Sequence, residues 1–395
     1  MKEDFFKYQA QTSNHPLAIE ISHANESFIY DTNGKSYLDF IAGVSANTLG
    51  HNHPKIIQAI KEQVEKYTHV MVYGEFIQQP QVNLAKLLAK NLPKPLETVY
   101  LTNSGTEATE GALKLAKRYT GRSEIIAAKN SYHGNTQGAM SVCGFELQNS
   151  AFRPLIPGIK FIEFNNVIDI QKITSKTAAV ILETIQGGAG FIEPKNNYLK
   201  KVKEKCDEVG ALLILDEIQT GIGRTGKLFG FENYNVIPHI IVAGKGLGGG
   251  MPIGAFISSN KIMSCLKTHP KLGHITTFGG HPVIASAANA TLIELLNSNL
   301  IKETLHKEKL IRKLLIHPLI TEIRGKGLML AIIVKTEEIA SKVILNSLEK
   351  GLLLFWLLFE GKAIRITPPL TISNDEITKG CTIILETLNE LLVKS

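Results

Sequence analysis

Two short runs of apolar residues near the middle of the chain have the pattern of strands that are buried on both faces. One run, residues 211–215, leads directly into Asp216. The other run, residues 239–243, leads through Gly244 into Lys245. Branched apolar residues in runs this short are typical of parallel strands in the middle of a sheet. Because ligands bind just beyond the carboxyl ends of such strands, the pattern predicts that a carboxylate and an amine meet at one edge of a sheet.

Strands of this kind alternate with helices over most of the chain. Further strands are predicted over residues 99–101, 125–128 and 179–182. Apolar residues at helical spacing predict helices over residues 55–67, 80–91 and 109–119. Regular alternation of strands and helices is typical of an α/β fold with a mostly parallel central sheet.

The pattern changes after Pro282, where a helix over residues 283–297 is followed by shorter strands and helices. Near the other end of the chain, Asn33-Gly34 lies between two apolar segments and predicts a hairpin. We therefore expect a smaller α+β domain built from both ends of the chain. The predicted division is residues 1–50 as an N-terminal arm and part of the small domain, 51–285 as the large domain, and 286–395 as the rest of the small domain.

The composition narrows the class of protein. The 395 residues are 44% hydrophobic and carry a net charge of +7, without a block of like charges. This composition is ordinary for a globular protein and argues against nucleic-acid binding. The four cysteines are far apart, which argues against a zinc site or a disulfide framework and favours a reducing compartment. No apolar segment has the form of a signal peptide or the length of a membrane span, so we expect a cytoplasmic protein without a metal.

A lysine amine beside a carboxylate suits one cofactor in particular. A lysine in an apolar pocket can lose its proton and attack an aldehyde to give a Schiff base, and pyridoxal phosphate carries such an aldehyde. A fixed carboxylate keeps the pyridine nitrogen of that cofactor protonated, so that its ring accepts electrons. Lys245 and Asp216 fit these two roles, although a buried salt bridge between two strand ends is the alternative interpretation.

Three further segments follow predicted strands and add candidate residues. The first strand leads through Ser104, Gly105 and Thr106 into a helix. Helix N-termini of this kind bind phosphate, although a plain helix cap uses the same residue types. Tyr132 follows a second strand, where an aromatic ring can stack on a pyridine ring. Glu183 ends a third strand and is either a functional acid or a structural hydrogen-bond acceptor.

Two blocks of sequence resemble the class III aminotransferases, the pyridoxal-phosphate family that contains ornithine and acetylornithine aminotransferases. They are LDEIQTGIGRTG at residues 215–226 and AGKGLGGGMPIGA at residues 243–255. The resemblance extends from about residue 30 to about residue 373. It implies a pyridoxal-phosphate-dependent transaminase of fold type I that acts as a homodimer. It also implies an acetylornithine-like, ornithine-like or other ω-amino donor and a 2-oxo acid acceptor such as 2-oxoglutarate.

The resemblance also implies where each candidate residue lies relative to the cofactor and the substrate. The implied roles are Lys245 in the Schiff base, Asp216 at the pyridine nitrogen, Gln219 near the ring 3-oxygen, Tyr132 stacked on the ring, Ser104, Gly105 and Thr106 around the phosphate, Glu183 at a strand end beside the cofactor, Thr277 at the phosphate of the neighbouring subunit, and Arg365 at a substrate carboxylate.

Two positions depart from the pattern of the ornithine and acetylornithine enzymes. Asn135 stands where those enzymes usually have an arginine, and Gly188 stands where they have a glutamate that masks the carboxylate-binding arginine. We therefore hypothesise that no acid from this loop masks Arg365, and that the choice between a terminal amine and an α-amine is set differently. Arg153 is a candidate for the missing positive charge.

Two alternative functions remain open from the sequence. The same family contains aminomutases and racemases, which share the cofactor but need no acceptor. The segment from Gly221 to Gly226 also matches the pattern G-x-G-x-x-G of a nicotinamide-dependent dehydrogenase. That segment does not follow its strand directly, and no helical period comes after it, so its context disfavours the dehydrogenase.

Overall fold

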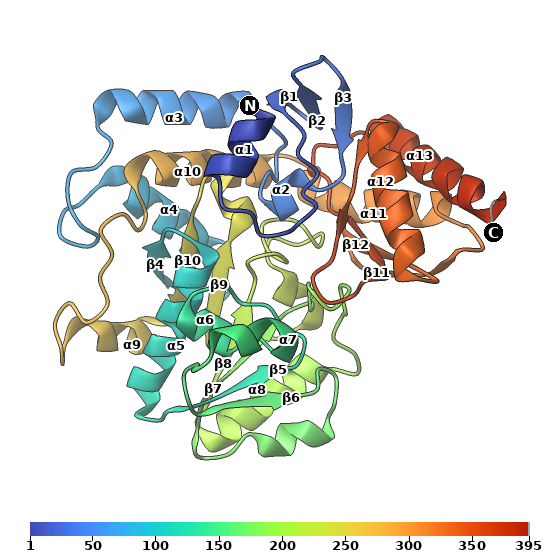
Figure 1. Cartoon of the computed structure of the whole chain (residues 1–395). Helices are drawn as coiled ribbons and strands as arrows, with labels where there is room; N and C mark the ends of the chain where they lie inside the picture. Colours follow the sequence, from blue (N-terminus) through green and yellow to red (C-terminus); the bar gives the residue numbers. More distant parts are fainter. Residues whose placement is uncertain (394–395) are drawn as a thin grey trace.

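A seven-stranded sheet forms the centre of the larger part of the molecule in the computed structural model, which describes residues 1–393 (Figure 1). In order along the sheet, its strands are β4 (Thr98–Thr102), β10 (Gly254–Ser258), β9 (Ile240–Gly244), β8 (Leu212–Asp216), β7 (Thr177–Glu183), β5 (Glu124–Ala128) and β6 (Ile159–Ile162). Strand β10 is antiparallel to both of its neighbours, and the other pairs are parallel. The predicted α/β fold with a mostly parallel central sheet is confirmed.

Both faces of this sheet are packed against helices. In β8, Leu213 and Leu215 belong to one apolar core, whereas Leu212 and Ile214 belong to a second core on the opposite face. This alternation explains why the strands read as continuous apolar runs rather than as an apolar and polar repeat. The helices of this part are α3 (Pro54–Lys66), α4 (Gln79–Lys90), α5 (Gly105–Thr120), α6 (Gln137–Ser141), α7 (Glu146–Asn149), α8 (Tyr198–Val209), α9 (Asn260–Met263) and α10 (Pro282–Asn297).

A smaller part contains two four-stranded sheets. One has the order β11 (Ile320–Lys326), β12 (Met329–Val334), β15 (Ala363–Ile366) and β14 (Phe355–Trp356). The other has the order β1 (Ile21–Asn25), β2 (Phe28–Asp31), β3 (Ser36–Asp39) and β13 (Leu352–Leu353). The remaining α-helices are α1 (Lys2–Tyr8), α2 (Ala42–Ser45), α11 (Leu300–Leu314), α12 (Glu337–Glu349) and α13 (Asn374–Val393).

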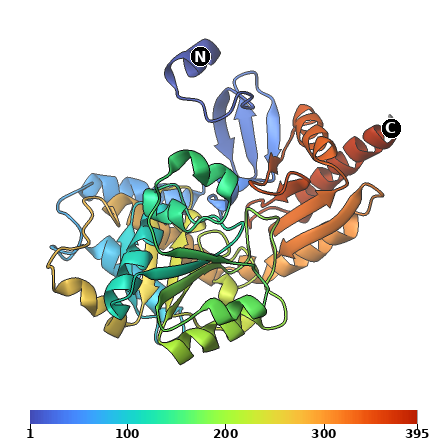
Figure 2. The same ribbon diagram turned by 60° about the horizontal axis from the view of Figure 1, so that its bottom comes forward.

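The second sheet joins the two ends of the chain, because β3 near the N-terminus pairs in parallel with β13 near the C-terminus. Figure 2 shows α1 standing away from the rest of the molecule, and none of its residues is buried. The predicted boundary at residue 285 falls inside α10, which packs against α3 and α4 (Figure 1). We therefore keep the division into domains as a proposal and place the end of the larger part after Asn297.

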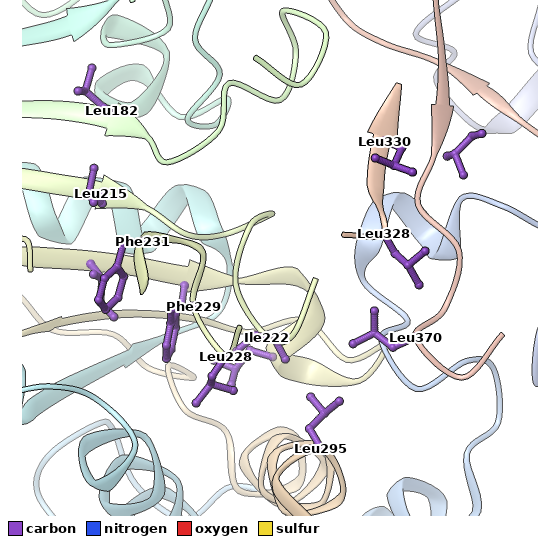
Figure 3. Packing of buried hydrophobic residues seen from close by; sticks show 14 of the residues in the cluster. Leu182, Leu215, Ile222, Leu228, Phe229, Phe231, Leu295, Leu328, Leu330 and Leu370 are labelled. Carbon is purple, nitrogen blue, oxygen red and sulfur yellow. The ribbon is translucent and has the colours of Figure 1, made fainter. Parts of the chain in front are cut away.

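One apolar core runs through the junction of the two parts (Figure 3). Leu215 lies at the sheet end of this core, Ile222 lies in the loop after β8, and Leu370 belongs to the smaller part. Gly223 and Gly226 in that loop have φ values of 85° and 81°, which only glycine adopts without strain. A β-carbon at Gly223 would lie 2.8 Å from Leu370. Gly223 and Gly226 of the G-x-G-x-x-G segment therefore serve packing between the two parts.

The same loop lacks the helix that a dinucleotide site requires. The residues that follow it form a short 3-10 helix, Gly230–Tyr234, instead of an α-helix. Within the loop, Arg224 is buried and donates hydrogen bonds to the carbonyl oxygens of Leu328 and Pro368 in the smaller part. The structure thus gives the loop a role in joining the two parts and removes the basis of the dehydrogenase alternative.

Glu217, next to Asp216 in sequence, is another buried residue of this loop. Its carboxylate accepts hydrogen bonds from the hydroxyls of Thr184 and Thr220 and from the N–H groups of Gly230 and Phe231. A buried carboxylate is stable only when such donors surround it.

None of the helices in residues 1–393 is both long and apolar enough to cross a membrane.

Candidate active site

The structure brings Asp216 and Lys245 to the wall of one cavity of about 500 Å³. Asp216 is the last residue of β8, and Lys245 directly follows β9, its parallel neighbour. The two apolar runs therefore deliver both side chains to the same edge of the sheet, as the sequence predicts. The third strand of this group, β7, ends at Glu183, which also lines the cavity.

The backbone and the surroundings of Lys245 are both unusual. Its φ of 42° lies in the left-handed region, which is uncommon for a residue with a side chain and is often found at functional sites. A β-carbon at the next residue, Gly246, would lie 2.3 Å from the hydroxyl of Thr48. Burial lowers the pKa of the Lys245 amine, Asp216 opposes that change, and the positive charge of Arg365 adds to it. A lowered pKa makes the free amine, which is the nucleophile, available at a lower pH.

Two hydrogen bonds orient the carboxylate of Asp216. One oxygen accepts from the N–H of Ile218 at 2.9 Å, and the other lies 2.7 Å from Nδ1 of His133. His133 is buried and also lines the cavity, so it is a site residue that sequence reasoning missed. The sequence does contain one indication of this role, because His133 directly follows Tyr132 in the segment after a predicted strand. The contact fixes where the carboxylate points, and Asp216 lines the cavity.

Glu183 acts as an acceptor for two backbone groups. One of its oxygens accepts from the N–H of Tyr132 at 3.0 Å, and the other accepts from the N–H of Gly187 at 2.8 Å. Burial, together with the nearby Asp216 carboxylate, raises the pKa of Glu183 to about 7. Glu183 therefore ties the aromatic segment at residue 132 to the loop after β7.

The N-terminus of α5 opens on the cavity. Gly105 and Thr106 are among the lining residues. The Ser104 hydroxyl accepts the N–H of Glu107 at 3.3 Å, so Ser104 is the helix cap, and it is not among the lining residues. The first N–H groups of a helix have no partners within the helix and carry partial positive charge. The open N-terminus of α5 therefore presents partial positive charge to the cavity.

Arg365 is a second positive group that lines the cavity. It lies in β15, is 5% exposed, and its guanidinium stands 5.6 Å from the ring centroid of Phe191. Its Nε and Nη1 atoms are buried and have no hydrogen-bond partner among the described residues. Burial lowers the pKa of Arg365 to about 10, so the group stays charged near neutral pH. A buried charge without a partner needs an anionic ligand.

Three other predicted residues occupy different surroundings. Gln219 lines the cavity, with its amide nitrogen 3.4 Å from the hydroxyl of Ser45. Thr277 is exposed and is not among the residues that line the cavity. Arg153, the candidate for the missing charge, lies on the surface and forms an ion pair with Glu146 instead of lining the cavity.

The two departures from the family pattern, Asn135 and Gly188, both line the cavity. No acid is bonded to Arg365 among the described residues, and the acids that line the cavity, Glu183 and Asp216, already accept the hydrogen bonds described above. A β-carbon at Gly188 would lie 2.7 Å from the ring of Phe359, which occupies that space. An aromatic ring therefore stands where a side chain at position 188 would be.

These groups fit pyridoxal phosphate. Its phosphate is matched by the open N-terminus of α5, where a β-carbon at Gly105 would meet Ile218 at 2.7 Å and only bare backbone fits. Lys245 matches its aldehyde, Tyr132 matches its ring and Asp216 matches its ring nitrogen, and all three residues line one cavity. When bound, the cofactor supplies an electron sink for breaking a bond to hydrogen at the substrate carbon. This set of groups on a mostly parallel sheet defines the class of pyridoxal-phosphate-dependent enzymes of fold type I.

Comparison with known proteins gives the family within that class. The family model for aminotransferase class-III matches residues 8–388. The chain therefore belongs to the class III aminotransferases, and its cofactor is pyridoxal phosphate. A structure of ornithine aminotransferase from Toxoplasma gondii, 31% identical to this chain, contains that cofactor at partial occupancy in its active site.

Similar proteins cover nearly the whole chain. An acetylornithine aminotransferase from Caldanaerobacter subterraneus subsp. tengcongensis is 39% identical and covers 98% of both chains. A putrescine aminotransferase from Pectobacterium atrosepticum is also 39% identical, over 95% of this chain and 83% of the relative. A crystal structure of the Toxoplasma gondii ornithine aminotransferase has a TM-score of 0.92, with 31% identity over 100% of this chain and 96% of that chain.

Proposed function

We propose that this aminotransferase moves an amino group from an acetylornithine-like, ornithine-like or other ω-amino donor to a 2-oxo acid such as 2-oxoglutarate. The observation that carries the proposal is one cavity that is lined by Lys245 and Asp216, at one edge of the sheet, and by Arg365, which has no hydrogen-bond partner at two buried nitrogen atoms among the described residues. The amine suits attachment of the cofactor as a Schiff base, and the arginine suits the carboxylate that a donor and a 2-oxo acid share.

Four contacts hold the cofactor in the proposed arrangement. Asp216, oriented by His133, keeps the ring nitrogen protonated, so the ring accepts electron density during the reaction. Tyr132 and Gln219 line the same cavity, where Tyr132 would stack on the cofactor ring and Gln219 would reach its 3-oxygen. The phosphate is held by the helix N-terminus, whose residues are Ser104, Gly105 and Thr106.

Lys245 and Arg365 act on the substrate. Lys245 would hold the cofactor through its Nζ, and as a free amine the same Nζ would act as the base and acid that moves the proton of the substrate carbon. Burial, which lowers the pKa of this amine, favours the unprotonated form that accepts the proton. Arg365 holds the substrate carboxylate, and the apolar side chains of Ile185 and Trp356 exclude water from the same cavity.

We also propose a homodimer in which Thr277 reaches the cofactor phosphate of the neighbouring subunit. Thr277 is exposed, and its neighbour Phe278 is 53% exposed although its ring lies 4.8 Å from that of His69. The segment that contains Phe76 and Ile77 lies beside Thr277, because the N–H of Tyr73 donates to the carbonyl oxygen of Thr276. Phe76 and Ile77 are 58% and 94% exposed. Large apolar side chains that gather on a surface favour a protein partner, and a second copy covers them in the proposal. Light scattering of the purified protein measures the mass directly.

The proposed location is the cytoplasm.

The donor is identified by assay with a panel. We expect purified protein to transfer an amino group from at least one of acetylornithine, ornithine and putrescine to 2-oxoglutarate, which consumes the acceptor. A racemase would invert its substrate without an acceptor, and an aminomutase would move the group within one molecule. Turnover that is independent of any added 2-oxo acid would therefore contradict the proposed transamination.

Replacing Arg365 with glutamine is expected to raise the KM for carboxylate substrates about a hundredfold, the loss expected for a charge-assisted hydrogen bond. The positive charge of Arg365 also lowers the pKa of Lys245, so its removal raises that pKa. Attachment of the cofactor to the apoprotein then requires a higher pH, which a pH titration of the visible absorption measures. Arg153→Gln is the control, because Arg153 is exposed and paired with Glu146. Equal effects of the two substitutions would contradict the assignment.

A further inference from the structure

Gly188 and Phe359 form a direct contact at the side of the cavity. A β-carbon at Gly188 would lie 2.7 Å from each of two ring carbons of Phe359. The N–H of Phe359 donates to the carbonyl oxygen of Gly188 at 2.9 Å. The same ring stacks on Phe145, with 4.4 Å between the ring centroids and 24° between the planes. Phe359, which follows β14 in the smaller part, is thus anchored to two segments of the larger part.

This contact continues a series of hydrogen bonds that begins on the cofactor side of the cavity. Glu183 holds the N–H of Tyr132 with one oxygen and the N–H of Gly187 with the other. Gly187 precedes Gly188, whose carbonyl holds Phe359. The position of Phe359 is therefore set by the same loop that fixes the residue proposed to stack on the cofactor.

The segment that Phe359 anchors forms an apolar wall of the cavity, and we call residues 355–358 the wall segment. Phe355, Trp356 and Leu358 line the cavity, and Phe355 is the strand partner of Arg365. Phe355 and Leu358 are 39% and 50% exposed. Within the smaller part, pairing of β14 with β15 and the buried Leu357 hold the wall segment. Its exposed side chains receive limited support from packing, so the anchor at Phe359 adds the contact that holds the wall segment against the larger part.

We propose that Phe359 is a positioning residue for substrate selection. Its ring, seated in the space that Gly188 leaves free, holds the wall segment and the adjacent Arg365 at a set distance from Lys245. The wall segment then limits the length of the uncharged part of a substrate whose carboxylate is bound by Arg365. This inference rests on the proposed function, because it concerns the substrates of the same cavity.

The single tryptophan of the chain reports the position of the wall segment without any turnover, because Trp356 belongs to it. We expect Phe359→Ala and Gly188→Ala each to move the tryptophan emission to longer wavelength and to increase its quenching by acrylamide. The reason is that either change releases the wall segment toward solvent. Phe152→Ala removes a ring that is 55% exposed and serves as the control, which leaves the emission unchanged.

A double-mutant cycle tests the contact itself. Gly188 does not have a left-handed φ, so alanine at this position is opposed by the ring of Phe359 and not by the backbone. The effect of Gly188→Ala on emission and on melting temperature is therefore expected to disappear when Phe359 is already alanine. A Gly188→Ala effect of equal size in both backgrounds would overturn the proposed pairing.

Substrate selection is measured with pyruvate, 2-oxobutyrate and 2-oxohexanoate as acceptors and with the best donor of the panel. In Phe359→Ala we expect KM to rise about tenfold, which is in the upper range for the loss of one stacked aromatic pair. We expect kcat to change less than about threefold. We also expect the differences in kcat/KM among the acceptors to shrink. An unchanged spread would overturn the role in selection. A protein that transfers no amino group to any acceptor would refute the proposed function instead, and the fluorescence cycle would still decide the pairing.

Discussion

Replacing Lys245 with alanine is expected to lower the rate of amino transfer by about 10⁴-fold, which corresponds to about 5 kcal/mol of transition-state stabilisation. The proposed mechanism uses this one amine twice, to attach the cofactor and to move the proton. No other lysine lines the cavity among the described residues, so no neighbouring amine takes over either step. The visible absorption band of the lysine-bound cofactor is expected to disappear in the same variant.

The fold is expected to survive this change. The Lys245 side chain makes no hydrogen bond with the described residues, and its burial lowers its pKa, so the charged amine is not a source of stability. The melting temperature of the apoprotein should therefore stay the same or rise. Lys227→Ala, in the exposed part of the nearby loop, is the matched control and keeps full activity. An added small amine such as methylamine should restore part of the rate, and a Lys245→Ala variant within tenfold of wild type would contradict the assignment.

The meeting of Asp216 and Lys245 could be predicted from the sequence because it depends on local pattern alone. Two apolar runs, each of strand length, end at the two residues, and parallel strands share one carboxyl edge. The hairpin at Asn33-Gly34 was predictable for the same reason, because the turn residues and the flanking apolar segments are adjacent in the chain.

Contacts between distant segments could not be predicted in this way. His133 reaches Asp216 across 83 positions of sequence, and only the order of the strands in the sheet brings them together. The antiparallel strand β10 was missed because Gly254–Ser258 is short, begins with two small residues and follows the glycines after Lys245, so that it resembles the end of a loop. In the same way, the pairing of Gly188 with Phe359 depends on how the two parts pack, which no local pattern records.

The glycine-rich segment after β8 shows how one pattern arises from two different physical causes. A dinucleotide site needs glycines so that a phosphate can approach the backbone. In this chain, a β-carbon at Gly226 would lie 2.6 Å from Leu305, so the glycine admits a side chain from the smaller part. Close approach to the backbone is common to both cases, and the sequence pattern does not identify what approaches. The absence of a following helical period was the informative feature.

Asp216→Asn is expected to lower kcat by about 10³-fold, or about 4 kcal/mol, the loss typical of removing one preorganised electrostatic group from an active site. The amide keeps the shape of the side chain and can still accept the N–H of Ile218. It carries no charge, however, and cannot keep the ring nitrogen protonated. We expect the variant to fold and to bind the cofactor, with a KM close to that of wild type, because binding of the substrate carboxylate depends on Arg365. Steady-state kinetics and the visible spectrum measure both effects.

Glu217→Gln provides the contrast to Asp216→Asn, because the two acids are adjacent in sequence but face different surroundings. The carboxylate of Glu217 satisfies four buried donors, two hydroxyls and two backbone N–H groups. An amide cannot accept from all four, so we expect the free energy of unfolding to fall by about 2–4 kcal/mol, while kcat of the folded enzyme changes less than about threefold. Denaturant unfolding and kinetics at low temperature separate the two quantities. Two outcomes would show that Asp216 is not the acid that acts on the cofactor. One is a loss of stability in Asp216→Asn as large as that in Glu217→Gln. The other is a loss of turnover in a fully folded Glu217→Gln protein. Asp216 lines the cavity and Glu217 does not, so we expect catalysis to depend on Asp216 and stability to depend on Glu217.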